Sequence, residues 1–157
     1  MSPRVVNLYD SGEWERTEER PGWRSKDAWI GRRLGAELIG GSMYELEPGN
    51  RLWPYHTHHA NEEWLLVVRG LPTLRTPEGE RNLKEGDVVA FPRGDRGLHQ
   101  VINHTDAPIR VLMLSTTIVP EILEYPDSDK VGANSATGER LFLSRRGEAV
   151  EYWEGED

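Results

Sequence analysis

All five histidines of this sequence fall into two clusters, and two glutamates closely follow the first cluster. The residues are His56, His58, His59, Glu62 and Glu63 in the first cluster and His99 and His104 in the second. Because alternate residues of a strand point to the same face, His56 and His58 can direct both imidazoles toward one centre. His59 has the opposite parity and is a poor partner for that centre. The pair therefore predicts a chelating site on one face of a strand.

The sequence positions of the other candidate ligands, a glutamate and a third histidine, define them less sharply. Glu62 and Glu63 can each reach back across a tight turn to the histidine pair. Strand parity does not choose between them, because both faces of the run that follows are apolar. Apolar residues on both faces predict a strand that is covered outside as well as inside. In the second cluster His99 shares a face with Val101, whereas His104 takes the other face and is the less favoured ligand.

Three imidazoles and one carboxylate form a nitrogen and oxygen donor set. Such a set suits Fe(II), Mn(II), Ni(II), Co(II) or Zn(II), and a six-coordinate ion would keep two positions for water, substrate or O2. We therefore expect one divalent metal ion per chain, of unassigned identity. The alternative is a group of surface histidines beside a turn, which an isolated His-x-His pair would fit equally well.

The composition narrows the classes of function. With 157 residues the chain is long enough to bury a core as one domain. A formal net charge of −8 opposes general attraction to nucleic acid or anionic lipid, so neither is an expected partner. The absence of cysteine excludes thiolate metal sites, disulfides and cysteine nucleophiles. No apolar stretch has signal-peptide or membrane-spanning length, and we expect a cytoplasmic protein.

The elements that would position these side chains are strands. Short apolar runs between scattered glycines and prolines are typical of an all-β domain with many turns and few helices. The expected strands are residues 35–47, 52–58, 63–68, 71–75, 88–91, 98–103 and 109–117.

The two ends of the chain differ from this central region in composition. Residues 1–34 are polar but include Trp14, Trp23 and Trp29, which predicts an arm that packs on the core domain or on a second subunit. Residues 35–119 form the expected core. Residues 120–157 are an expected extension, with loops at 125–129 and 132–135. Its acidic end carries Tyr152 and Trp153, which either dock or remain in a solvated tail.

The surroundings of the two histidine clusters resemble the two motifs of the cupin superfamily. The first motif places glycines before and after a His-x-His pair and a glutamate. The matching residues are Gly49, then after six residues His56 and His58, after four Glu63, and after six Gly70. That count selects Glu63 over Glu62. The resemblance covers about residues 35–117, and the chain is similar to small bacterial single-domain cupins without an assigned activity.

The second motif begins with a glycine and continues through Pro-x-Gly to a histidine and an asparagine. Here the residues are Gly86, Pro92, Gly94, His99 and Asn103. The gap of four residues before His99 is longer than the gap most common in the family, which puts the approach of His99 in question. Asn103 either steadies His99 or forms the turn that follows.

The resemblance implies an all-β fold: a single antiparallel jelly-roll (cupin) β-barrel with an N-terminal arm and a C-terminal extension. It also implies that His56, His58, Glu63 and His99 hold the metal inside the barrel. Residues 1–34, 35–119 and 120–157 would then be the arm, the cupin β-barrel core and the extension. Tyr44, Arg51, Trp53, Phe91 and Met113 are candidates for the pocket wall, but alternation does not show which of them face inward.

Two functions are compatible with this reading. The first is a metal-dependent enzyme, of dioxygenase or isomerase type, that acts on a small molecule with two oxygen donors. The second is a non-catalytic module that binds or senses a small molecule, and the retention of all four expected ligands favours metal binding in either case. The tryptophan-bearing arm and the strand with two apolar faces also predict a homodimer.

Overall fold

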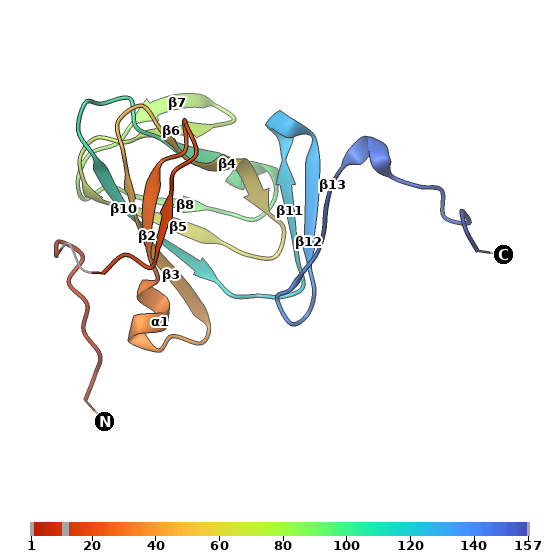
Figure 1. The fold of residues 1–157 in the computed structure, drawn as a ribbon, viewed down its shortest axis with the longest axis horizontal. Helices are drawn as coiled ribbons and strands as arrows, with labels where there is room; N and C mark the ends of the chain where they lie inside the picture. Colours follow the sequence, from red (N-terminus) through yellow and green to blue (C-terminus); the bar gives the residue numbers. More distant parts are fainter. Residues whose placement is uncertain (1, 11–12, 157) are drawn as a thin grey trace.

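Two antiparallel β-sheets face each other and enclose the core of the protein (Figure 1). The computed structural model describes residues 2–10 and 13–156. One sheet has the strand order β1-β2-β3-β10-β5-β8, and the other has the order β13-β12-β11-β4-β9-β6-β7. The predicted all-β, antiparallel jelly-roll fold is confirmed.

The strands are short and turns separate them. Their bounds are β1 Arg16–Glu18, β2 Ser25–Ala28, β3 Ile39–Leu46, β4 Arg51–His58, β5 Glu63–Arg69, β6 Thr73–Thr76, β7 Gly79–Asn82, β8 Val88–Phe91, β9 His99–Ile102, β10 Ile109–Thr116, β11 Glu121–Tyr125, β12 Lys130–Asn134 and β13 Arg140–Arg145. Helical elements are limited, in the part described, to α1 Ile30–Leu34 and the 3-10 turns η1 Asp95–Gly97, η2 Pro126–Ser128 and η3 Arg146–Glu148.

Each of the seven expected strands occurs, and two expectations about local structure were wrong. The first strand begins at Ile39 rather than at Gly35, because Gly35 ends helix α1 in the left-handed region at φ 75°. The segment 132–135, expected as loop, lies largely in β12, because this strand pairs with β11 on one side and β13 on the other.

The core lies between the two sheets and is built by alternation. In β5, Leu65 and Val67 point inward and are 0% and 1% exposed. Their neighbour Val68 points outward and packs in a second apolar cluster with Leu112 of β10. The prediction that this strand is covered on both faces therefore holds for Val68, whereas Trp64 at its start remains 54% exposed.

The N-terminal residues provide the outer cover of the first sheet. Val6, Leu8 and Trp14 pack against the second apolar cluster. Strand β2 pairs with β3, and β1 forms the edge of this sheet. The buried guanidinium of Arg110 anchors this segment, since its Nη1 atom donates to the carbonyl oxygens of residues 8, 9 and 10 at 3.0–3.2 Å. Its Nη2 atom lies 2.7 Å from a carboxylate oxygen of Glu45.

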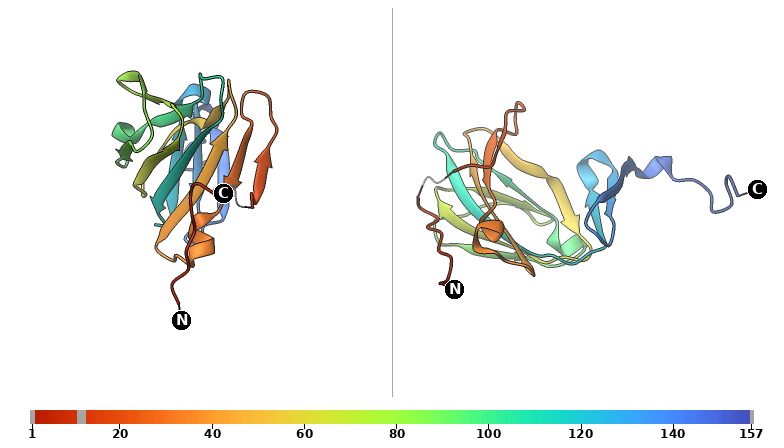
Figure 2. Two further views of the ribbon diagram at one scale, coloured as in Figure 1. Left: turned by 90° about the vertical axis from the view of Figure 1, so that its left-hand side faces the viewer. Right: turned by 60° about the horizontal axis from the view of Figure 1, so that its bottom comes forward.

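The C-terminal residues extend the second sheet rather than covering it. Strand β11 pairs with β4 and β12, and β13 forms the edge of the sheet. The chain then runs away from the barrel (Figure 2). The rings of Tyr152 and Trp153 contact each other with centroids 4.7 Å apart and are largely exposed. None of the helices described has the length and apolar character needed to cross a membrane.

Candidate metal centre

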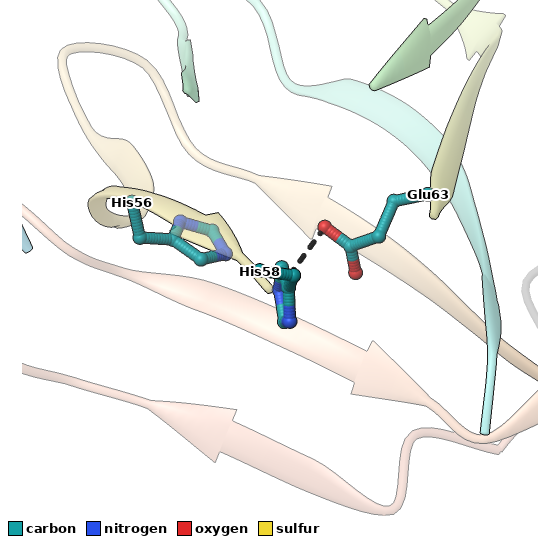
Figure 3. A group of neighbouring side chains, drawn as sticks. All are labelled: His56, His58 and Glu63. Atoms are coloured by element: carbon teal, nitrogen blue, oxygen red, sulfur yellow. Dashed lines mark ion pairs between the residues drawn. The ribbon is translucent and has the colours of Figure 1, made fainter. Parts of the chain in front are cut away.

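Three side chains of the first histidine cluster converge at the inner side of the barrel (Figure 3). His56 and His58 come from the end of β4, and Glu63 is the first residue of β5 after a short turn. One ligand atom from each of the three lies within 4.8 Å of the others. Alternation along β4 and the tight connection to β5 are thus sufficient to bring two imidazoles and one carboxylate together.

His99 joins this group from the neighbouring strand β9. It is the register partner of His56, and the two ring centroids lie 4.7 Å apart. The long gap before His99 does not turn it away, because the extra residues form η1, which ends at Gly97. A Cβ atom at Gly97 would lie 1.8 Å from the carbonyl oxygen of Pro92, so this turn requires glycine. Phe91 then stacks on the His99 ring at 3.8 Å and fixes its plane.

Hydrogen bonds set the orientation of two imidazoles. The Nδ1 atoms of His56 and His99 lie 2.8 Å from the carbonyl oxygens of Pro54 and Gly97. A carbonyl accepts only, so Nδ1 carries the proton in the neutral ring and Nε2 presents a lone pair. The Nε2 atoms of His58 and His99 each lie 3.3 Å from Oε2 of Glu63.

This arrangement leaves a buried carboxylate oxygen without a hydrogen-bond partner. Oε2 of Glu63 is buried, and none of the described residues donates a hydrogen bond to it. When the imidazoles are neutral and present their Nε2 lone pairs, these lone pairs and those of Oε2 converge without a donor and repel one another. Such a buried arrangement is costly unless a cation lies between them. The donor set therefore fits a divalent ion held by His56, His58, Glu63 and His99.

The protonation of three of the four groups agrees with ligand chemistry. Burial, together with the neighbouring His99 and His58, lowers the pKa of His56 to about 3. Burial also lowers the pKa of His99. At His58 burial acts in the same direction, but the carboxylates of Glu63 and Glu121 overcome it and raise the pKa. Burial raises and the adjacent histidines lower the pKa of Glu63, with a net decrease. The group thus holds a carboxylate and two neutral imidazoles at neutral pH.

Two residues of the C-terminal segment complete the centre, and the sequence analysis missed both. Oε2 of Glu121 lies 3.4 Å from Nδ1 of His58, on the side of the ring away from Glu63. Oε1 of the same carboxylate accepts from the backbone N–H groups of residues 59, 60 and 122 at 3.0 Å. Tyr125 stacks on His56 with centroids 6.0 Å apart. The alternation of Glu121, Leu123 and Tyr125 is the signal that could have identified a strand facing the site.

A cavity of about 220 Å³ opens beside these ligands. Of the five candidates for its wall, Tyr44, Trp53 and Met113 line it, together with Pro54, Leu123 and Tyr125. Phe91 is buried behind His99, and Arg51 lines a neighbouring cavity instead. The wall is therefore mainly aromatic and aliphatic, with His56, His58, Glu63 and His99 at one side.

The residues that the sequence analysis set aside point elsewhere. His59 pairs with Glu124 at 2.6 Å, and His104 is exposed beside Glu80 at 3.6 Å. Glu62 is exposed. Among the described residues, the side chain of Asn103 makes no hydrogen bond with His99. Its amide donates to the carbonyls of residues 46 and 107, and its oxygen accepts from residue 105, so it forms the turn.

Comparisons with known proteins agree with this architecture. Residues 42–115 match the family of the cupin domain. A sugar phosphate isomerase of the cupin superfamily from Silicibacter pomeroyi has a TM-score of 0.74 and 29% sequence identity, over 83% of this chain and 82% of that chain. A proposed sugar phosphate isomerase from Acidithiobacillus ferrooxidans has a TM-score of 0.80 over 95% and 96%, and its 22% identity shows the fold alone.

A curated relative matches over a shorter region. The auxin-binding protein ABP19b from Prunus persica is 36% identical over 81 residues. The match covers 47% of this chain, and the chain spans only 37% of that protein.

Proposed function

Because residues 42–115 form a cupin domain, we propose that the chain is a divalent-metal-dependent enzyme that acts on a small molecule with two oxygen donors. One ion per chain would be held by His56, His58, Glu63 and His99. The single observation that carries the proposal is the convergence of imidazole lone pairs on the buried, unpartnered Oε2 of Glu63. The same donors accept iron, manganese, nickel, cobalt or zinc.

The chain's own residues define what such a site can do. A bound divalent ion supplies a Lewis acid that polarises a carbonyl or hydroxyl oxygen. Burial raises the pKa of Tyr44 and Tyr125, so both phenols remain protonated at neutral pH and can donate a hydrogen bond to a substrate oxygen. Trp53, Met113 and Leu123 give the rest of the cavity an apolar wall.

Of the two reaction types, an isomerase is better supported than an oxygenase. The support is the similarity to the sugar phosphate isomerase from Silicibacter pomeroyi, which extends over most of both chains. An aldose–ketose isomerisation transfers protons between adjacent carbon and oxygen atoms and needs a polarised carbonyl, which suits a chelating site with neutral phenol donors.

A non-catalytic binding module is the second candidate. It is supported by the 36% identity to a protein named for binding auxin. The two functions differ in turnover. Incubation of the metal-loaded protein with an aldose phosphate would yield the ketose phosphate if the chain is an isomerase, and would return the aldose phosphate unchanged if it only binds.

Elemental analysis tests the metal centre directly. We expect about one divalent ion per chain in the purified protein and its loss in His56→Ala and His99→Ala, with folding of both variants verified by circular dichroism. His104→Ala is the matched control, since this histidine is exposed and remote from the cluster. Wild-type protein that stays metal-free after incubation with Fe(II), Mn(II), Ni(II), Co(II) and Zn(II) would refute the proposal.

A further inference from the structure

A second and larger cavity lies beside the metal cavity and shares Trp53 and Pro54 with it. Its volume is about 800 Å³. We call it the outer chamber. Three parts of the chain line it: the β1–β2 hairpin, residues of the barrel in β4, β6, β7 and β9 and just after β9, and the segment from the turn after β11 to the start of β12. It therefore depends on the N-terminal and C-terminal segments as well as on the barrel.

The outer chamber reverses the charge balance of the protein. The whole chain has 19 basic and 27 acidic side chains. The cationic residues that line the chamber are Arg16, Arg20, Arg51, Arg75 and Lys130, and the acidic ones are Glu18, Glu80 and Asp127. An acidic protein with a locally basic cavity attracts anions to that cavity and repels them elsewhere.

Not all of these cations are neutralised by neighbours. Arg75 forms two hydrogen bonds with the carboxylate of Asp127, at 2.6 and 2.9 Å. Arg16 pairs with carboxylates of residues 18 and 27. In contrast, Arg20, Arg51 and Lys130 make no ion pair with any of the residues described. These three side chains retain their full capacity to donate hydrogen bonds to an anion.

Two of the unpaired cations lie against aromatic rings, one of which also lines the metal cavity. The guanidinium of Arg51 is 5.9 Å from the centroid of the Trp23 ring. Nζ of Lys130 is 5.6 Å from the centroid of Tyr125, the residue that stacks on His56 inside the metal cavity. The aromatic contacts hold the side chains in place and leave their N–H groups free.

Trp53 forms part of the boundary between the two cavities and is held in an unusual conformation. Its φ of 57° lies in the left-handed region, which a bulky residue rarely adopts. The pairing of β4 with β9 shifts register between residues 52 and 56. The side-chain amide of Gln100 donates to the carbonyl oxygen of Trp53 at 2.6 Å. The Trp53 ring packs edge-on against the Tyr44 ring, with centroids 5.7 Å apart. Backbone strain of this kind clusters at ligand sites.

The metal cavity by itself is small for a substrate. Its volume of about 220 Å³ lies below the roughly 300–1,000 Å³ typical of ligand pockets. Its lining contains no lysine or arginine, so an anionic group would find no counter-charge other than the metal centre. A substrate with an anionic end must therefore extend past Trp53 and Pro54.

We propose that the outer chamber binds the anionic end, a phosphate or carboxylate, of a substrate whose oxygen-chelating end occupies the metal cavity. Arg51 and Lys130 are the principal donors to this anion, and Arg20 adds a third positive charge. This inference rests on the proposed function for the chelating end only, since the chamber's charge and volume do not depend on the metal.

Calorimetric titration of the purified protein with matched sugars tests the inference. Fructose 6-phosphate, galacturonate and neutral fructose serve as probes with a phosphate, a carboxylate and no anion. In the wild type we expect one anionic probe to bind at least about tenfold more tightly than fructose, and the tighter of the two identifies the anion. In the Arg51→Gln/Lys130→Gln variant that probe should lose about 10- to 100-fold in affinity, while the affinity for fructose stays the same.

The control variant is Arg69→Gln/Lys84→Gln, which removes the same charge at two exposed positions that line neither cavity. It should retain wild-type affinity for all three probes. Equal losses in both double variants, or no preference of the wild type for either anionic probe over fructose, would overturn the chamber's role. Repeating the titration with the His99→Ala variant separates this result from failure of the metal centre, because the chamber's preference for an anion persists without a metal.

Discussion

Replacement of Glu121 by glutamine should weaken metal binding although Glu121 is not one of the expected ligands. Its Oε2 atom lies 3.4 Å from Nδ1 of His58 and holds the proton on that nitrogen, which leaves Nε2 to face Glu63. A glutamine amide in place of Oε2 would donate to Nδ1 and favour the other tautomer. His58 would then carry its proton on Nε2, where the ion must bind.

The size of the effect follows from the contacts that glutamine keeps and loses. Glutamine retains an oxygen that can accept from the three backbone N–H groups now bound to Oε1. It loses the acceptor that faces His58 and the side-chain amide of Asn61. Removal of such a supporting partner typically costs about 10- to 100-fold in metal affinity, or about 1.4–2.7 kcal/mol.

The assay is a titration of metal-free protein with Co(II) in competition with a chelator, followed by visible absorption. Glu124→Gln is the control, because this residue makes the same kind of contact with His59 on the same strand, away from the site. We expect a dissociation constant raised about 10- to 100-fold in Glu121→Gln and unchanged in Glu124→Gln. Circular dichroism confirms folding. Identical constants for a folded Glu121→Gln and the wild type would refute the role assigned to Glu121.

Three further predictions concern stability and assembly. Because the pKa of His56 is about 3 in the folded protein and 6.5 is the ordinary value, the unfolded chain takes up the proton first. In metal-free protein, His56 should therefore lower the unfolding free energy by about 1.4 kcal/mol for each pH unit below pH 6.5. Denaturation at pH 7 and at pH 5 should show a larger fall in unfolding free energy for the wild type than for His56→Gln. An equal fall in the two proteins would contradict the prediction. Gly97→Ala should lower the unfolding free energy by about 3 kcal/mol or more, because the new Cβ meets the Pro92 carbonyl. Gly49→Ala, at φ 72° in open space, should lower it by only about 1–2 kcal/mol. Similar melting temperatures of the two variants would count against the close contact at Gly97. We propose a homodimer through the exposed Trp64 face, so light scattering should report a dimer for the wild type and a monomer for Trp64→Glu, and a monomeric wild type would exclude it.

The convergence of His56, His58 and Glu63 was predictable because it depends on local geometry. His56 and His58 share a strand face by alternation, and Glu63 follows across a turn too short to lead elsewhere. The same periodicity set His59 aside, and the structure pairs it with Glu124. The resemblance to the cupin motifs chose Glu63 over Glu62, which spacing alone did not do.

Sequence patterns were less informative where the length of a loop departs from the usual spacing. The extra residues before His99 left its approach open. The structure shows that they form a 3-10 turn in which Gly97 packs against the Pro92 carbonyl. A glycine in that place signals close backbone contact, but a sequence does not say with what.

Tertiary structure alone decided which distant segments reach the site. Glu121 and Tyr125 lie outside both motifs and contact His58 and His56 only because β11 pairs beside β4. The outer chamber likewise needs a hairpin from one end of the chain and a turn near the other. Strand alternation determines which face of a sheet a side chain occupies. The order of strands in a sheet depends instead on packing between segments far apart in sequence. That order brought the Glu121 carboxylate, the aromatic wall and the cations of the outer chamber to the candidate metal centre.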